Sequence, residues 1–340
     1  MNSNRKIGKI AFSRPVTCRT EEHPYIEIDN ESISIGSRIN EVIQRLRVES
    51  PDVFVCGRFS ERLAFYRGIK KTFIPRFLMR ERFKMIMLDN EWHCRYRDSY
   101  YWHMIFRREV GKIYKRLVAK GVSYLQVFTE AEADNYAQFY GIDRKKFVFI
   151  PFCSRLDKTS FPRSRGDYLF TGGLHDRDYM TLFAAVRDLP ITLRIAAPKE
   201  HFDAADVPSN VQLLGRIPPN EYYLQIAASR AVILSLEYSS LRFPGIITYV
   251  EAMRMGKAVI VNDPLGAKDY ISNRETGLLI PNKDPLAMKE AIVELCDDAV
   301  FTERLEENAF IYAKENLGYD RYFADINRLI ERVMSEGVQK

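Results

Sequence analysis

The strongest constraint on the fold is an alternation of short apolar runs with helix-like segments along most of the chain. The runs are continuously apolar and rich in β-branched and aromatic side chains, which is typical of strands buried on both faces of a parallel sheet. This order of elements predicts a doubly wound α/β architecture. The expected strands are Lys9–Ser13, Asp52–Cys56, Phe83–Leu88, Ser123–Phe128, Phe147–Pro151, Tyr168–Phe170, Thr192–Ala196, Val211–Leu214, Ala231–Leu236, Ala258–Asn262 and Leu278–Ile280.

The helical segments and one polar stretch predict the domain organisation. Thr129-Glu-Ala-Glu132 is a capping box, which predicts a helix that ends before Gly141. We expect an N-terminal domain at 1–155, a linker at 156–165, a second domain at 166–318 and a C-terminal helix within 319–340 that packs back on the first domain. The other expected helices are Arg38–Val48, Ile105–Ala119, Tyr179–Arg187, Ile246–Met255 and Leu286–Cys296, and the C-terminal one covers Arg321–Met334.

Composition and charge exclude several classes of protein. The 340 residues are 46% hydrophobic and 28% charged, which excludes a disordered or fibrous chain. Five scattered cysteines predict reduced thiols, and without a signal peptide or a membrane-spanning run we expect a cytoplasmic protein. Residues 1–150 hold 28 Lys and Arg against 18 Asp and Glu, whereas the remainder holds 23 against 27. The basic half therefore suits an anionic partner: nucleic acid, membrane lipid or a phosphorylated substrate.

The most informative segment runs from Arg242 to Val261. It reads as a loop ending in Pro244-Gly245, then a helix with proline near its first turn, then a strand. Glycine permits close backbone approach, and the N–H groups from Gly245 to Thr248 lie at the positive end of the helix dipole, so we expect a phosphate site there. The spacing alone also fits a plain loop–helix–strand unit.

Several stretches then follow one another in a recognisable order: Leu169–Leu182, Val211–Ile217, Glu251–Ile260, Lys268–Ile280 and Asp284–Ile292. Over residues 166–300 they resemble the C-terminal domain of GT-B glycosyltransferases, most of all the retaining glycosyltransferase family 4. The resemblance implies the GT-B fold, in which two Rossmann-like, doubly wound parallel-sheet domains face a central cleft. It also implies that the C-terminal domain binds a nucleotide sugar.

The resemblance also assigns expected roles to individual residues. It implies that Glu251 holds the ribose hydroxyls and that Arg177 stabilises the leaving diphosphate. The strand and turn at Val211–Ile217 would border the nucleotide base. The implied donor-binding residues are Gly172, Gly173, Gly215, Arg216, Pro244, Gly245, Ile246, Ile247, Thr248 and Glu251.

Two positions depart from the family pattern. Gly173 stands where many members carry a second basic residue, and Phe243 stands where the family's first glutamate is expected. Neither Glu237 nor Arg242 has the spacing to replace that glutamate, which leaves open a degenerate member that binds nucleotide but transfers slowly or not at all. No DxD-type motif follows a strand, so we expect no metal and no cofactor beyond a UDP- or GDP-linked sugar as co-substrate.

The first half offers candidates for the acceptor side. Asp89 and His93 follow an expected strand, at the edge where open α/β sheets bind ligands, so we expect them to contact the transferred sugar or the acceptor hydroxyl as catalytic residues. They could instead cap a helix or pair with Arg95 and Arg97. Residues 62–84 and 95–116 interleave basic and aromatic side chains, which suits peripheral docking on an anionic membrane or, alternatively, a solvated basic face.

Together these features predict a glycosyltransferase. It would move a sugar from a nucleoside-diphosphate sugar to a hydroxyl of a glycan or a polyprenyl-phosphate-linked acceptor, with retention and without a metal, in surface polysaccharide or glycolipid synthesis at the inner face of the membrane. A GT-B epimerase or phosphorylase would need a different carboxylate or a cofactor lysine. A non-enzymatic Rossmann-type protein that binds nucleotide or nucleic acid is the alternative from another class, but nucleic acid is not an expected partner because the best motifs lie in the acidic half.

Overall fold

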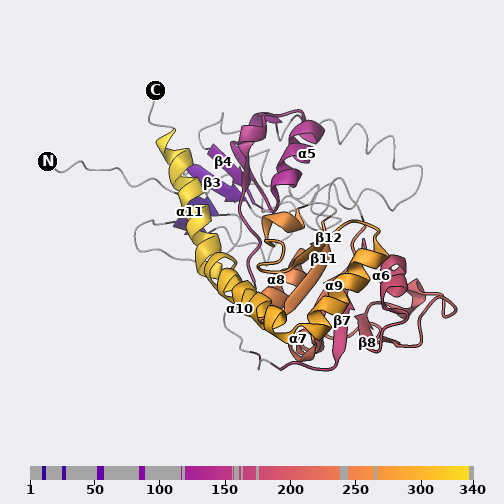
Figure 1. The fold of residues 1–340 in the computed structure, drawn as a ribbon. Helices are drawn as coiled ribbons and strands as arrows, with labels where there is room; N and C mark the ends of the chain where they lie inside the picture. The colour runs from indigo at the N-terminus through magenta and orange to yellow at the C-terminus, as the bar shows by residue number, and fades with distance from the viewer. Residues whose placement is uncertain are drawn as a thin grey trace, which may run out of the picture. The chain divides into compact units, whose positions relative to one another are not determined.

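The chain divides into two compact units in the computed structural model (Figure 1). The first contains Met1–Phe128, Ala133–Ile150 and Phe323–Lys340, and the second contains Thr129–Glu132 and Pro151–Tyr322. The structure describes residues 10–12, 25–27, 52–56, 84–88, 116, 119–154, 156, 161, 164–173, 176–237, 244–263 and 266–336.

The first unit is built on a parallel six-stranded sheet. Its strands lie in the order β2-β1-β3-β4-β5-β6, so the chain reverses direction across the sheet between β1 and β3. The strand β2 was not expected, because its three residues lie in a polar stretch without an apolar run. The strands are β1 (Ile10–Phe12), β2 (Tyr25–Glu27), β3 (Val53–Cys56), β4 (Lys84–Met87), β5 (Tyr124–Val127) and β6 (Phe147–Phe149).

Three helical segments lie wholly or mostly in this unit. The helix α5 (Glu130–Tyr140) begins as the capping box predicts, since the Thr129 hydroxyl accepts a hydrogen bond from the N–H of Glu132 at 3.0 Å, and it ends before Gly141. The short 3-10 helix η3 (Arg144–Lys146) leads into β6. Most of α11 (Tyr319–Ser335) belongs to the first unit, where the Lys84 ammonium donates a hydrogen bond to the carbonyl of Val333 at 3.0 Å.

The second unit holds the other parallel sheet, in the order β12-β11-β10-β7-β8-β9. Counted within this unit, the order is 3-2-1-4-5-6 read from β9, which is that of the Rossmann fold. The predicted doubly wound parallel architecture is therefore confirmed. The strands are β7 (Tyr168–Gly172), β8 (Thr192–Ala196), β9 (Val211–Leu213), β10 (Ala231–Leu234), β11 (Ala258–Asn262) and β12 (Leu278–Ile280).

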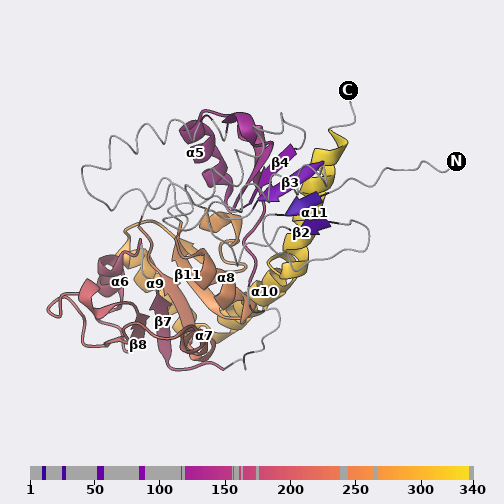
Figure 2. The ribbon, with the colours of Figure 1, turned by 180° about the vertical axis from the view of Figure 1, so that it is seen from behind.

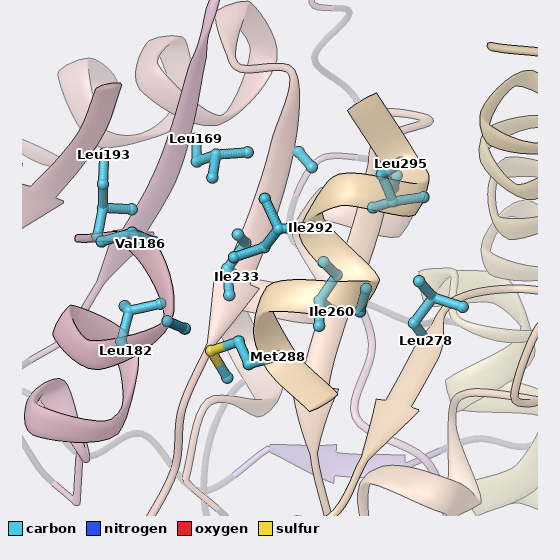
Figure 3. Close-up of a cluster of buried hydrophobic side chains, with 14 of the residues drawn as sticks. Leu169, Leu182, Val186, Leu193, Ile233, Ile260, Leu278, Met288, Ile292 and Leu295 are labelled. Carbon is cyan, nitrogen blue, oxygen red and sulfur yellow. The ribbon is translucent and has the colours of Figure 1, made fainter. Parts of the chain in front are cut away.

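Helices α6 and α9 cover one face of this sheet, and alternation along each strand turns every second side chain toward them. Because α8 contacts β10 and β11 and is not part of this cluster, it covers the opposite face of the sheet. Figure 2 shows the ribbon turned by 180° from Figure 1, with α8 and β11 labelled. Figure 3 shows the cluster formed by Leu182 and Val186 of α6, Met288, Ile292 and Leu295 of α9, and Leu169, Leu193, Ile233, Ile260 and Leu278 of the strands. The helical segments are α6 (Tyr179–Val186), η4 (Lys199–His201), α7 (Pro219–Ala228), α8 (Ile246–Arg254), η5 (Ala267–Asp269), α9 (Pro285–Asp297) and α10 (Ala299–Asn316).

The sequence pattern did not reveal α7 and α10. The helix α7 begins at Pro219, after a second proline, and a Pro-Pro pair reads as a loop although proline is favoured at the first helical position. The helix α10 buries Phe301 and Leu305 but continues its buried face with Ala309 and Ala313, and it exposes Val300 and Ile311, so its apolar stripe is weak in the sequence. The described residues of the expected linker, Leu156, Phe161, Ser164 and Arg165, lie in neither a helix nor a strand.

Candidate active site

The second sheet has one position where ligands are expected to bind. Strands β7 and β10 are hydrogen-bonded neighbours, and from them the chain proceeds in opposite directions, to β8 on one side and to β11 on the other. Open α/β sheets bind ligands beyond the carboxyl ends of the strands at such a reversal. The residues that follow β7 and β10 therefore form the candidate site.

The two loops that leave β7 and β10 are tied together by their backbones. Arg177 and Leu236 form an isolated antiparallel bridge. The N–H of Asp178 donates to the carbonyl of Ser235 at 2.9 Å, and the N–H of Glu237 donates to the carbonyl of Asp176 at 3.1 Å. The described parts of both loops thus have a defined relative position at the edge of the sheet.

A buried asparagine at the end of β11 holds the backbone of Leu236 in the loop after β10. The side-chain oxygen of Asn262 accepts a hydrogen bond from the N–H of Leu236 at 2.6 Å, and its amide nitrogen donates to the carbonyl of Leu236 at 2.7 Å. The same nitrogen donates to the side-chain oxygen of Asn282 at 2.9 Å. Asn262 therefore satisfies both backbone groups of the residue that bridges to Arg177, and the sequence analysis did not single it out.

The guanidinium of Arg177 lies against Gly172, which ends β7, and Gly173, which follows it. Its Nε donates to the carbonyl of Gly172 at 3.1 Å. Gly173 has a φ of +138°, and a Cβ on this residue would lie 2.6 Å from Cζ and 2.8 Å from Nε of Arg177. The glycine that stands in place of the family's second basic residue thus makes room for the side chain of Arg177.

The site places this cation in poorly solvated surroundings. Burial lowers the pKa of Arg177, while the nearby Tyr222, Tyr179 and Asp176 act in the opposite direction. An arginine remains protonated at neutral pH even so, and a charge shielded from water interacts more strongly with a bound anion. Tyr179, whose pKa is raised to about 12 mainly by burial, donates its hydroxyl proton to the carbonyl of Gly173 at 3.1 Å.

The N-terminus of α8 forms the second part of the site. Gly245 is the N-cap, with a left-handed φ of +83°, so the helix begins at Ile246. Pro244 consequently precedes the N-cap and does not lie in the first turn, which corrects the sequence-based expectation. A Cβ on Gly245 would lie 3.1 Å from Leu236, so the glycine also allows α8 to approach the end of β10 closely. The N–H groups of Ile246, Ile247 and Thr248 lie in the first turn, at the positive end of the dipole.

Tyr222 of α7 was not expected at the site. Its hydroxyl is hydrogen-bonded to Oγ1 of Thr248 at 2.8 Å, and its ring meets Phe170 edge to face with the centroids 5.2 Å apart. A Cβ on Gly172 would lie 2.5 Å from Cε2 of Tyr222, so the ring occupies the space that this glycine leaves open. No motif could have indicated Tyr222, since its relation to Thr248 and Gly172 depends on the strand order.

Glu251 lies deeper than the other candidate residues. Its side chain is fully buried, and Oε2 accepts a hydrogen bond from the Ser154 hydroxyl at 2.6 Å. The N–H of Ser154 in turn donates to the carbonyl of Leu317 at 2.7 Å. The structure thus gives Glu251 a protein partner on the segment that begins the second unit, and its role toward a ribose stays a prediction.

The remaining expected residues lie farther away or outside the described part of the chain. Gly215, with a φ of +76°, and Arg216 follow the edge strand β9, two strands from β7, and Arg216 approaches Glu200 to 3.8 Å. Asp89, His93 and Phe243 lie outside the described residues, as do segments 62–84 and 95–116 apart from Lys84 and Arg116.

The described residues also bear on membrane spanning and metal binding. None of the helices formed by the described residues is both long and apolar enough to cross a membrane. The described His, Cys, Asp and Glu side chains include no group of three placed to hold a metal ion, and metal independence stays a prediction.

Comparisons with known proteins agree with this architecture. Residues 196–311 match the family model of glycosyl transferases group 1, whereas no curated protein sequence matches the chain significantly. A glycosyltransferase from Rickettsia africae ESF-5 is 14% identical, with a TM-score of 0.64 over 92% of this chain and 85% of the other. HepE from Anabaena in complex with UDP and glucose is 15% identical, with a TM-score of 0.62 over 91% and 86%.

WaaG, a glycosyltransferase involved in lipopolysaccharide biosynthesis, is 15% identical, with a TM-score of 0.57 over 91% of this chain and 87% of its own. At these identities the structural matches show the fold, and the family model covers the part of the second unit that carries Tyr222, α8 and Glu251. The chain has the fold of GT-B glycosyltransferases, and its residues 196–311 match the glycosyl transferases group 1 model; together these findings support a glycosyltransferase.

Proposed function

We propose that the chain transfers a sugar from a nucleoside-diphosphate sugar to a hydroxyl of a glycan or a lipid-linked acceptor. The observation that carries the proposal is that Tyr222 contacts both parts of the candidate site. Its hydroxyl is bonded to Thr248 in the first turn of α8, and it fills the space beside Gly172, whose carbonyl accepts the Nε bond of Arg177. A diphosphate is the ligand that a half-buried cation and a helix N-terminus both favour. The complexes of HepE, which has the same fold, with UDP and with UDP-glucose support this class of donor.

The same two features account for the chemistry of the transfer. As the bond between the sugar and the diphosphate breaks, negative charge develops on the leaving group, and donors that are already oriented toward it lower the barrier. In the proposal, Arg177 and the N–H groups of the first turn of α8 stabilise this charge without a metal. The transfer proceeds with retention, as the resemblance to family 4 implies.

The acceptor is proposed to be part of a surface polysaccharide or glycolipid, carried by a polyprenyl phosphate. The role of WaaG, which shares the fold, in lipopolysaccharide biosynthesis supports this class. The basic and aromatic segments 62–84 and 95–116 support docking on an anionic membrane at its cytoplasmic face. Flotation with vesicles tests the docking: binding to anionic but not to neutral vesicles is expected, and equal behaviour with both would contradict it.

A thermal-shift panel of UDP, GDP, ADP, CMP and dTDP tests the donor site. One nucleoside diphosphate at about 100 times its Kd stabilises the folded state by ~2.7 kcal/mol, enough to raise Tm by several degrees. The shift should disappear in Arg177→Ala. Arg144→Ala is the matched control, since Arg144 pairs at 2.7 Å with the exposed Asp134 in the first unit.

A panel without any shift, or a shift that survives in Arg177→Ala, would contradict the proposed donor site. Metal independence is tested separately, by measuring transfer from the sugar conjugate of the identified nucleotide in the presence of EDTA. Activity is expected to persist, and complete loss that Mg²⁺ or Mn²⁺ restores would refute that part of the proposal.

A further inference from the structure

The hydroxyl groups of Tyr222 and Thr248 form an isolated pair in the described part of the structure. They are joined by one hydrogen bond of 2.8 Å, in which either oxygen could be the donor. Each hydroxyl carries one proton, so two protons are available and the shared bond uses one. One O–H of the pair is therefore left to donate elsewhere.

Only one direction of this hydrogen bond leaves the phenol proton of Tyr222 available to a ligand. Thr248 is 5% exposed, whereas Tyr222 is partly exposed. In that direction, Oγ1 of Thr248 donates to the phenolic oxygen of Tyr222, and the O–H of Tyr222 remains available. Accepting this bond polarises the phenol and strengthens its own O–H as a donor.

The phenol is also held at the right place. Its ring rests edge to face on Phe170, and a Cβ on Gly172 would lie 3.0 Å from the hydroxyl oxygen. The same residue, Gly172, accepts the Nε bond of Arg177, whose charge acts on Tyr222. The pKa of Tyr222 is raised mainly by burial, so the phenol stays protonated, and able to donate, at neutral pH.

We infer that Tyr222 is a further binding residue for the donor: its O–H donates a hydrogen bond to a phosphate oxygen of the nucleoside diphosphate, while Thr248 orients it. The inference rests on the proposed function and adds a neutral donor to the cation of Arg177 and the N–H groups of α8. Gly172 then has a purpose of its own, because any side chain there would displace the phenol.

The test compares Tyr222→Phe, which keeps the ring and removes only the hydroxyl, with Tyr223→Phe on the next residue of α7. The ring of Tyr223 lies near Phe161, with the centroids 6.1 Å apart. Tyr223→Phe also removes one phenol hydroxyl from α7 and is therefore the matched control. Kd is measured by calorimetry for UDP and GDP, whichever the wild type binds. A hydrogen bond to a charged group predicts that Kd rises about tenfold or more in Tyr222→Phe and stays within about twofold in Tyr223→Phe.

Thr248→Val provides an independent measurement should Tyr222→Phe not fold. It should raise Kd by about threefold, and in the double variant with Tyr222→Phe it should add almost nothing, because Thr248 acts through the phenol. If the wild type binds UDP or GDP and Tyr222→Phe binds it within about twofold of wild type, Tyr222 is not a ligand and the inference alone is overturned. Unchanged binding in Thr248→Val when Tyr222→Phe is unfolded also overturns it. If the wild type binds none of the nucleotides of the thermal-shift panel, the proposed function falls and the inference falls with it.

Discussion

Substitution of Gly173 by alanine perturbs the site through two physical effects that the structure specifies. The φ of +138° at this residue is one that L-amino acids rarely adopt, so any side chain strains the backbone. The new Cβ would also lie 2.6 Å from Cζ of Arg177, which requires the guanidinium to move away. Both effects act at the end of β7, where Arg177 is bonded to Gly172.

The size of the effect follows from these contacts. Backbone strain of this kind costs about 1–3 kcal/mol. Displacing the guanidinium forfeits a charge-assisted hydrogen bond worth about 1.5–3 kcal/mol. If the chain relaxes part of the strain, we expect Gly173→Ala to lower the free energy of unfolding by about 2–4 kcal/mol, and to weaken nucleoside-diphosphate binding by about as much as Arg177→Ala does.

A double-mutant cycle separates an effect on binding that acts through Arg177 from a general loss of structure at the site. Stability is measured by urea denaturation followed by circular dichroism, and Kd by calorimetry, for Gly173→Ala, Arg177→Ala and the combined variant. Because the alanine acts on binding through Arg177, it should hardly change Kd once Arg177 is absent. An equal loss of affinity in both backgrounds would refute the reasoning, as would a Gly173→Ala protein as stable as the wild type.

Three further substitutions report on buried contacts. Replacing Asn262 by alanine leaves the N–H and carbonyl of Leu236 without their side-chain partners. Urea denaturation should then show that the free energy of unfolding falls by about 2–4 kcal/mol. An unchanged midpoint would mean that these two hydrogen bonds do not stabilise the fold. Replacing Ser154 by alanine removes a hydrogen bond to the buried carboxylate of Glu251. In the same assay the free energy of unfolding should fall by about 1.5–3 kcal/mol, and a fall below about 0.5 kcal/mol would contradict this. Burial, reinforced by the nearby carboxylates, raises the pKa of Tyr249 well above its usual value in the folded protein. Near pH 10 the phenol therefore ionises in the unfolded chain but not in the folded one, so the free energy of unfolding should fall as pH rises through about 10. Tyr249→Phe should make that fall less steep in denaturation measured from pH 8 to 11, and an identical slope would exclude Tyr249 as its source.

The sequence predicted the sheets better than the helices between them. A buried parallel strand needs a continuous apolar run, and β8, β11 and β12 have the bounds that their runs predict. The buried face of α10 does recur every four residues, at Phe301, Leu305, Ala309 and Ala313, but its second half is formed by alanines. Two large apolar side chains of the same helix, Val300 and Ile311, are exposed, so the apolar residues of this segment do not form one clear stripe in the sequence.

The candidate site was predictable where its parts are consecutive in the sequence. The turn at Gly245 and the first residues of α8 form one segment, and the loop with Arg177 forms another. The relation of Arg177 to Gly173 became clear only from the backbone conformation. Tyr222 lies 26 residues before Thr248, and they meet because β10 lies beside β7 in the sheet. Contacts of this kind follow from strand order, which a single sequence does not state.

The clamp of Asn262 on Leu236 has a consequence for the thermodynamics of recognition. Fixing the backbone of one residue costs about 1–2 kcal/mol of conformational entropy. Where Leu236 is held from β11 and bridges to Arg177, this cost is met when the chain folds and not when a ligand arrives. In the proposed donor site, a phosphate that reaches this edge of the sheet meets residues that are already in place, so its affinity reflects charge and hydrogen bonding with little loss to ordering.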